Sequence, residues 1–237
     1  MKDKFYLCTN QDYLEQINTY CKYDAYCSFI LYILLLVFSY FLGKTTLKYE
    51  NLNMLSEYTM YMLTGAYSLT FIGLVFFFCY LRKQKANTIG FSRKFAFQSL
   101  ATGFVFCFLV FIIWPNNMKY ILKNLSILKI VYYFIFVAFF EELTFRAYIG
   151  SRIHGITKNP IIAFFVTALL FSISHIPYQA VIHKTSIITY IFNNSDKLFQ
   201  YIFIAFIFQW LYTRYNSIIG PTILHFFWDF YRIQSWR

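Results

Sequence analysis

Long apolar windows dominate this chain and restrict the folds that are open to it. Windows of suitable length fall near residues 26–43, 60–81, 95–114, 126–149, 160–177, 197–212 and 217–232, and a further partial helix fits 178–192. About 20 apolar residues in a helix are needed to cross the hydrocarbon core of a bilayer. The windows therefore predict an all-α fold, a polytopic transmembrane helical bundle of about seven to eight spans.

The composition agrees with a membrane location. Of the 237 residues, 59% are hydrophobic and only 13% are charged, whereas soluble domains carry about 25% charged residues. The 21 basic residues outnumber the 10 acidic ones, but they lie mostly between the apolar windows, which indicates contact with the lipid bilayer rather than with nucleic acid. Five cysteines without C-x-x-C spacing predict neither a disulfide framework nor a cysteine metal site.

The loop between Arg82 and Lys94 sets the expected orientation. It carries five basic residues and no acidic one, which is typical of a cytoplasmic loop. With alternating spans the amino terminus then lies inside, and the count over all loops, including residues near the ends of the windows, is 12 basic residues inside and 9 outside. The richness in Lys, Asn, Ile, Tyr and Phe indicates an AT-rich bacterium. We therefore expect a multi-pass protein of a bacterial cell membrane with a cytoplasmic amino terminus.

Three acidic residues lie inside the apolar windows, namely Glu141, Glu142 and Asp229. Each costs about 2.5–3.5 kcal/mol at bilayer depth, and the three together cost roughly 8–10 kcal/mol, so a functional role is the first interpretation. Glu142 and Arg146 are four apart, the favourable order for an ion pair on one helix face. Glu141 points about 100° away from Glu142 on an α-helix and is free to face a cavity. The alternative is a structural Glu–Arg pair that ties helix ends together.

Two histidines lie at matching depth in later windows. His175 follows Phe171 by one turn, and His225 precedes Asp229 by four positions, so that the carboxylate can accept from the imidazole and fix its tautomer. At 1.5 Å per residue, Glu141, His175 and His225 all fall roughly 15–25 Å from the same membrane side. Read singly, each histidine can also be a packing or hydrogen-bonding residue. Read together, they predict one interior pocket.

Arg146 is expected to mark the inner membrane interface, with Glu141 about 7–8 Å inside it by helix rise. On that interpretation the pocket opens towards the cytoplasm. A glutamate in such a pocket is a candidate general base.

The ordered motifs resemble those of a known family, the CPBP intramembrane proteases, which comprise the CAAX prenyl protease type II enzymes and the bacterial bacteriocin-processing or immunity proteins (the Abi family). The matching motifs are Glu141-Glu142-x-x-x-Arg146, Phe171-x-x-x-His175 and His225-x-x-x-Asp229. The resemblance covers roughly residues 126–232, and the first three spans carry no motif. The expected organisation is an N-terminal interfacial segment (1–25), three spans with their loops (26–125) and a catalytic helical core (126–232).

The resemblance implies an endopeptidase that cleaves a peptide bond in or near the bilayer. By analogy Glu141 would activate water, His175 would help to hold that water, and Glu142 with Arg146 would hold the geometry of the site. The implied substrate is a small peptide or membrane-associated protein, such as a bacteriocin leader, a pheromone precursor or a self-immunity target.

The resemblance also assigns the third motif to the oxyanion, through His225 and Asp229. The family motif often ends in Asn, whereas an ionised aspartate cannot donate a hydrogen bond to an oxyanion. Asp229 is therefore protonated, an orienting partner of His225, or a metal ligand.

The sequence leaves the metal open and keeps other functions in play. Two histidines and a carboxylate can form an open zinc site, but the H-E-x-x-H helix of soluble zinc proteases is missing, and a glutamate–water mechanism without any cofactor is slightly favoured. A non-catalytic membrane immunity or scaffold protein that retains the motifs is the main alternative. A proton- or ion-coupled transporter is a third, against which the lack of an internal repeat argues.

Overall fold

The computed structural model describes residues 9–113 and 126–232, and the regular elements in these ranges are helices. An isolated antiparallel β-bridge joins Phe91 to Ser217. The helices are, in chain order, α2 (Gln11–Asn18), α3 (Lys22–Asn51), α4 (Glu57–Leu81), η1 (Ala86–Ile89), α5 (Ala96–Ile113), α7 (Ile127–Val131), η3 (Tyr132–Phe139), η4 (Glu142–Gly150), α8 (Ser151–Thr157), α9 (Pro160–Ser174), α10 (Ile176–Ile182), α11 (Ile187–Asn193), α12 (Ser195–Tyr215) and α13 (Ile219–Arg232). The predicted all-α helical bundle is confirmed, and the partial helix expected within 178–192 corresponds to α10 and α11.

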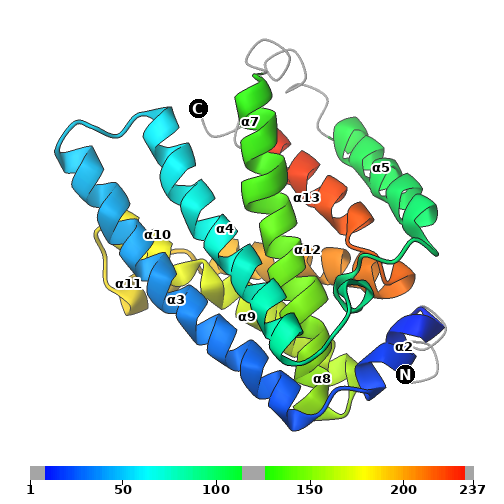
Figure 1. Ribbon diagram of the computed structural model, residues 1–237. Coiled ribbons are helices and arrows are strands. Elements are labelled where there is room, and N and C mark those ends of the chain that lie inside the picture. Colours follow the sequence, from blue (N-terminus) through cyan, green and yellow to red (C-terminus); the bar gives the residue numbers. More distant parts are fainter. Residues whose placement is uncertain (1–8, 114–125, 233–237) are drawn as a thin grey trace.

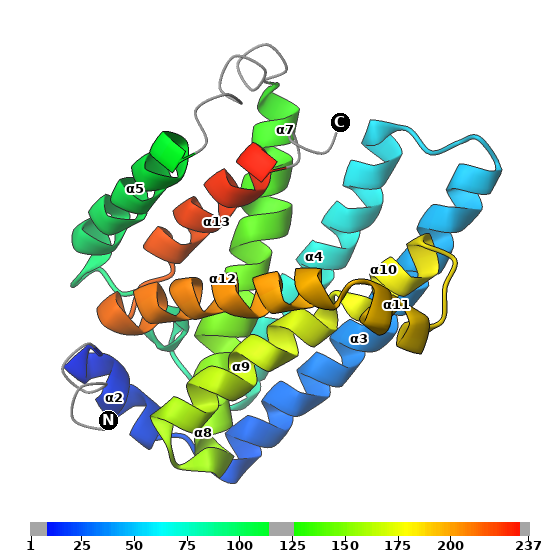
Figure 2. The ribbon, with the colours of Figure 1, turned by 180° about the vertical axis from the view of Figure 1, so that it is seen from behind.

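Figure 1 shows α3 and α4 as an antiparallel hairpin, with the continuous helix from α7 to α8 beside α4. Helices α5 and α13 pack against each other on the far side of that helix, and α12 runs across the direction of α4 and α7 in both views (Figures 1 and 2). Three helical stretches are long and apolar enough to cross a membrane, namely Lys22–Asn51, Glu57–Leu81 and Pro160–Ile182, and Ala96–Ile112 is a shorter apolar helix. The chain is therefore a helical membrane protein, while the count of seven to eight spans stays a prediction.

Local sequence signals explain where several helices begin and end. The Ser56 side chain accepts from the backbone N–H of Thr59 at the start of α4. The Asn159 side chain accepts from the first backbone N–H groups of α9, where Pro160 lacks an N–H that would otherwise need a partner. Lys158 ends α8 in the left-handed conformation, with φ of 48°. These caps fix the sharp turn between α8 and α9 that brings the second motif back towards the first.

The long helix between Ile127 and Thr157 is not wound as a plain α-helix. Residues Tyr132–Phe139 and Glu142–Gly150 form π-helical stretches, and only Phe140 and Glu141 between them are α-helical. The expected 3.6 residues per turn therefore does not hold through these two stretches. Because π-helical turns concentrate at functional sites, their position on both sides of Glu141 draws attention to that residue.

Burial changes abruptly at the same position. Every residue from Glu142 to Gly155 is buried, whereas most of 126–139 is exposed or half-buried. The core of this lower segment is aromatic and aliphatic, with Phe145, Leu143 and Tyr148 almost fully enclosed. Helices η4 and α8 therefore form the centre of the bundle.

Arg152 belongs to this buried centre, although it lies between the predicted windows 126–149 and 160–177, in a segment that alternating spans place on the cytoplasmic side. It is 0% exposed and donates to the backbone carbonyls of Thr88 (3.0 Å) and Ala147 (2.7 Å) and to Oε1 of Gln84 (2.8 Å). Its guanidinium also lies over the rings of Tyr20 and Tyr148. Carbonyl acceptors and aromatic faces replace water around the charge, so this arginine does not contact lipid headgroups.

The N-terminal segment packs on the same centre. Helix α2 buries Tyr13, Leu14 and Ile17, and Nδ1 of His154 in α8 lies 3.0 Å from the Ile17 carbonyl oxygen. Helix α3 begins at Lys22, four residues before the expected window. Residues 1–8 of the expected interfacial segment, and 114–125 of the expected second region, lie outside the described residues.

Candidate active site

Glu142 is the most enclosed acidic group of the site. It is 0% exposed, and its Oε1 atom lies 3.1 Å from Nη1 of Arg146 and 2.6 Å from Nδ1 of His225. The pair with Arg146 is the one that the four-residue spacing predicts. The pair with His225 joins residues that are 83 positions apart, and no local pattern points to it.

Arg146 is enclosed by protein rather than exposed at a surface, so its position is no guide to where the inner membrane interface lies. Its side chain is 1% exposed, and its guanidinium carbon lies 4.0 Å from the ring centre of Phe171 and 5.1 Å from that of Phe208. Aromatic faces attract a guanidinium, more strongly when water is excluded. The charge is therefore held in the interior by Glu142 and by two rings from α9 and α12.

His225, on α13, is surrounded by carboxylates. Its Nε2 atom lies 3.3 Å from Oδ2 of Asp229 and 3.6 Å from Oε2 of Glu141, while Nδ1 faces Glu142. A neutral imidazole has a single N–H. Since both ring nitrogens face carboxylate oxygens, the cluster holds an additional proton, either on the imidazole or on one of the carboxyl groups. The Phe208 ring stacks on the imidazole, with centroids 4.7 Å apart and planes at 26°.

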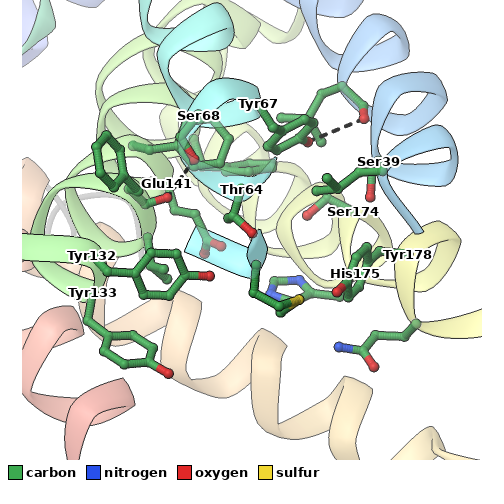
Figure 3. Close-up of a pocket in the computed structure, with 18 residues that line it drawn as sticks. Ser39, Thr64, Tyr67, Ser68, Tyr132, Tyr133, Glu141, Ser174, His175 and Tyr178 are labelled. Carbon is green, nitrogen blue, oxygen red and sulfur yellow. Dashed lines mark hydrogen bonds between the residues drawn. The ribbon is translucent and has the colours of Figure 1, made fainter. Parts of the chain in front are cut away.

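Glu141 differs from its neighbour in facing a cavity. Its side chain is 19% exposed, against 0% for Glu142, and it lines a cavity of about 300 Å³. His175 lines the same cavity, and Figure 3 shows the Glu141 carboxylate and the His175 ring directed into it from different helices. The structure thus brings Glu141, His175 and His225 to one place, as the matching depths predict.

His175 is held at the junction of α9 and α10, where Pro177 follows it closely. Its Nδ1 atom lies 2.9 Å from the carbonyl oxygen of Phe171, and because a carbonyl only accepts, Nδ1 is the donor. Nε2 is then the nitrogen left for a ligand or a water. The ring stacks on Tyr201 of α12 at 4.3 Å and 22°, which fixes its plane.

Much of the cavity wall comes from helices that carry no motif. Helices α3 and α4 contribute Leu35, Ser39, Leu42, Met60, Thr64, Tyr67 and Ser68. No sequence pattern points to these residues, because a few hydroxyl groups in an apolar window are a weak signal. Ser68 also shapes the wall directly, since its hydroxyl donates to the carbonyl oxygen of Phe136 in the π-helical η3 at 2.6 Å.

The zinc alternative requires at least three suitable side chains around one open position. Across 9–113 and 126–232, no group of three or more His, Cys, Asp or Glu side chains has an arrangement that could hold a metal ion. Cysteines 21, 27, 79 and 107 are free thiols.

The fold and the site together define a helical membrane protein with an acid–imidazole centre at a cavity among apolar helices. Residues 123–231 match the model of a protein family described as Rce1-like: Type II CAAX prenyl endopeptidase Rce1-like. This region is therefore an Rce1-like CAAX endopeptidase domain, and the resemblance to CPBP intramembrane proteases that the three motifs predict is confirmed. The family indicates a membrane protease that acts on a peptide or protein substrate. Neither the curated proteins nor the solved structures contain a match to this chain.

Proposed function

We propose that this chain hydrolyses a peptide bond with a water molecule activated by Glu141. The observation that carries the proposal is the position of the Glu141 carboxylate, which lines the cavity beside His175 and lies 3.6 Å from Nε2 of His225. An acid with neighbouring imidazoles, open to a cavity but enclosed by apolar helices, is suited to general base catalysis.

In the proposed reaction, a water held between Glu141 and Nε2 of His175 loses a proton to the Glu141 carboxylate. The hydroxide attacks the scissile carbonyl carbon and forms a tetrahedral intermediate whose oxyanion accepts from Nε2–H of His225. The intermediate collapses as the C–N bond breaks, and protonated Glu141 gives its proton to the leaving amine. The products are a carboxylic acid and an amine, and the enzyme regains its starting protonation.

The other motif residues are proposed to position this machinery. Glu142 holds Nδ1 of His225 and thereby turns Nε2 towards Glu141. Arg146 balances the charge of Glu142 and is itself fixed between Phe171 and Phe208. Asp229 lies within 3.3 Å of His225 Nε2, which supports an orienting role.

The substrate, the membrane location and the roles of the three regions of the chain are also proposals. We infer a small peptide substrate, such as a bacteriocin leader, a pheromone precursor or a self-immunity target, and a location in a bacterial cell membrane with the amino terminus in the cytoplasm. We infer that 126–232 is the catalytic core, that 26–125 supplies part of the cavity wall through α3 and α4, and that 1–25 lies at the interface.

The test is cleavage of candidate leader peptides by the purified protein in detergent, with mass spectrometry of the products. Glu141→Gln is expected to insert and fold as the parent does and to lose activity by about 10²–10⁴-fold, the usual contribution of a general base. The matched control is Glu50→Gln, which changes an exposed acid outside the cavity and should leave cleavage unchanged.

Normal processing by Glu141→Gln would refute the proposal. If both variants protected cells equally well while neither they nor the parent cleaved any peptide, a non-catalytic immunity role would be favoured. A chelator added to the same assay should leave the rate unchanged, because the proposed steps use only side chains and water.

A further inference from the structure

A second cavity lies apart from Glu141, at the end of the hairpin where α3 begins and α4 ends. Its volume is about 450 Å³, and it is lined by residues 19–21, Asp24, 82–85, 87 and 88. Among the residues that the structure describes, none lines both this cavity and the one beside Glu141. Figure 1 shows these two helix ends together, near α8. We call this second cavity the end cleft.

The lining of the end cleft carries an excess of positive charge. Arg82, Lys83 and Lys85 face a single acid, Asp24. That acid is already engaged, because its Oδ1 atom accepts from Nε of Arg82 (2.9 Å) and from Nε2 of Gln84 (2.9 Å). The ion pairs of the described residues do not include Lys83 or Lys85, and both lysines are exposed. Two ammonium groups at the cleft therefore have no counter-charge within 9–113 and 126–232.

A third uncompensated cation lies directly behind the cleft. The Nη2 atom of Arg152 donates to Oε1 of Gln84 (2.8 Å) and to Oγ1 of Thr88 (3.1 Å), and both acceptors belong to lining residues. Arg152 is 0% exposed, its Nε atom is buried without a hydrogen-bond partner, and the ion pairs of the described chain do not include it. A charge in a medium of low dielectric acts more strongly on its surroundings than one in water. Arg152 therefore adds to the positive potential of the cleft.

The position of the cleft relates this charge to the membrane. It lies where two helices that are long and apolar enough to span a bilayer have their common end, Lys22–Asn51 at its start and Glu57–Leu81 at its finish. Headgroups occupy the layer at the ends of such spans, and basic pockets between spanning helices bind anionic headgroups. Tyr23, Tyr80 and Leu81, chain neighbours of the lining residues, expose apolar surface of the kind that acyl chains cover.

We propose that the end cleft binds a phosphate group, with Lys83 and Lys85 as the donors that meet its charge. Phosphate oxygens are strong acceptors, and lysine and arginine are their usual partners in proteins. An anionic membrane lipid and inorganic phosphate carry this group alike. The bound group joins the start of α3 to the end of α4 and, through Gln84 and Thr88, to Arg152 in α8. It therefore stabilises the fold, and the proposal does not depend on the proposed function.

The test is the melting temperature of the purified full chain in an uncharged detergent, in phosphate-free buffer of fixed ionic strength. Three additions are compared: dioleoylphosphatidylglycerol, inorganic phosphate, and dioleoylglycerol, which has the same acyl chains without the phosphate. Saturating phosphatidylglycerol should raise the melting temperature by about 5 °C, as a ligand that binds only the folded chain does. Dioleoylglycerol should leave it unchanged.

Variants show whether the response comes from the end cleft. The double variant Lys83→Gln with Lys85→Gln should lose at least about half of the rise, because two donors to the phosphate are removed. The matched control, Lys44→Gln with Lys48→Gln, removes the same charge from exposed positions towards the other end of α3 and should keep the full rise. Asn87→Glu leaves both lysines in place and adds a carboxylate to the lining, so it should also weaken the response.

The arms distinguish the two sources of the group. A rise with phosphatidylglycerol alone assigns the site to a lipid, and a rise with inorganic phosphate as well shows that the phosphate is sufficient without acyl chains. No rise with either, or an equal rise with dioleoylglycerol, would overturn the proposal. An unchanged response of both the double lysine variant and Asn87→Glu would overturn it too. Glu141→Gln should respond as the parent does, so a failure of the catalytic proposal is separable from a failure of this one.

Discussion

Nδ1 of His225 lies 2.6 Å from Oε1 of Glu142, and the same oxygen is 3.1 Å from Nη1 of Arg146. One carboxylate thus joins the first and third motifs and neutralises a buried guanidinium. Glu141, one position earlier, contacts the same imidazole only at 3.6 Å and faces the cavity. Adjacent glutamates therefore carry different tasks, with Glu142 in the framework and Glu141 at the reacting centre.

This division predicts unequal effects on stability. Glu142→Ala should lower the free energy of unfolding by about 3–5 kcal/mol, the usual result of leaving a buried charge without its partner, because Arg146 loses its counter-charge and His225 its hydrogen-bond partner. Glu141→Gln should change it little, since that side chain is partly exposed to the cavity. Thermal melting of both variants in the same detergent measures the difference. Equal melting temperatures would show that the two glutamates are not divided in this way.

Phe208 is expected to matter although it lies outside the three motifs. It is 0% exposed, stacks on the His225 imidazole at 4.7 Å and lies 5.1 Å from the Arg146 guanidinium. Phe208→Leu keeps an apolar side chain but removes the ring, and loss of an interaction of roughly 1 kcal/mol should reduce kcat about fivefold. The control is Phe203→Leu, which changes an exposed phenylalanine on the same helix. If the two variants retained the same kcat, the ring would have no positioning role.

The pairs within one helix could be predicted because helical geometry places residues four apart on one face. Glu142 with Arg146 and His225 with Asp229 are both within 3.3 Å. The meeting of Glu141, His175 and His225 also followed from counting residues from the turns, since helix rise converts sequence distance into depth. The hydrophobic composition and the long apolar windows were sufficient to predict a helical bundle.

Other features depend on tertiary packing that one sequence does not encode locally. The contact between Glu142 and His225 depends on how α13 lies against η4. The position of the Arg146 guanidinium between the rings of Phe171 and Phe208 depends on how α9 and α12 pack. An arginine near the end of an apolar window was assigned to the interface, yet two phenylalanines enclose it. The π-helical winding around Glu141 has no composition signal, since the same residues suit an α-helix.

His154 lies outside the predicted membrane-spanning windows, and its burial predicts that the stability of the protein depends on pH. It is 4% exposed. Burial lowers the pKa of its imidazole, and the Lys158 ammonium lowers it further, while the hydrogen bond to the Ile17 carbonyl opposes them. The unfolded chain then binds the proton more readily, so the contribution of His154 to stability is complete above about pH 6.5 and is lost as pH falls through the lower folded value.

The melting temperature of the parent should therefore fall between pH 7.5 and pH 5.5 more steeply than that of His154→Gln. Glutamine keeps a donor for the Ile17 carbonyl but does not titrate. Differential scanning fluorimetry in one detergent across this range gives the two slopes. Parallel slopes would show that the junction of α2 and α8 does not sense protons through His154.

Asp229 offers the sharpest test of how the third motif works. Its Oδ2 atom lies 3.3 Å from Nε2 of His225, and its side chain is 27% exposed, against 4% for the imidazole. An orienting role needs only a hydrogen-bonding group there, whereas a metal ligand needs the carboxylate. Asp229→Asn should therefore keep cleavage within about tenfold of the parent, since an amide can also donate to an oxyanion. Asp229→Ala should lose about 10²-fold, because His225, the proposed oxyanion donor, then loses the group that orients it. If Asp229→Asn lost cleavage, and added zinc raised the activity of the parent protein but not of the variant, the carboxylate would instead be assigned to a metal.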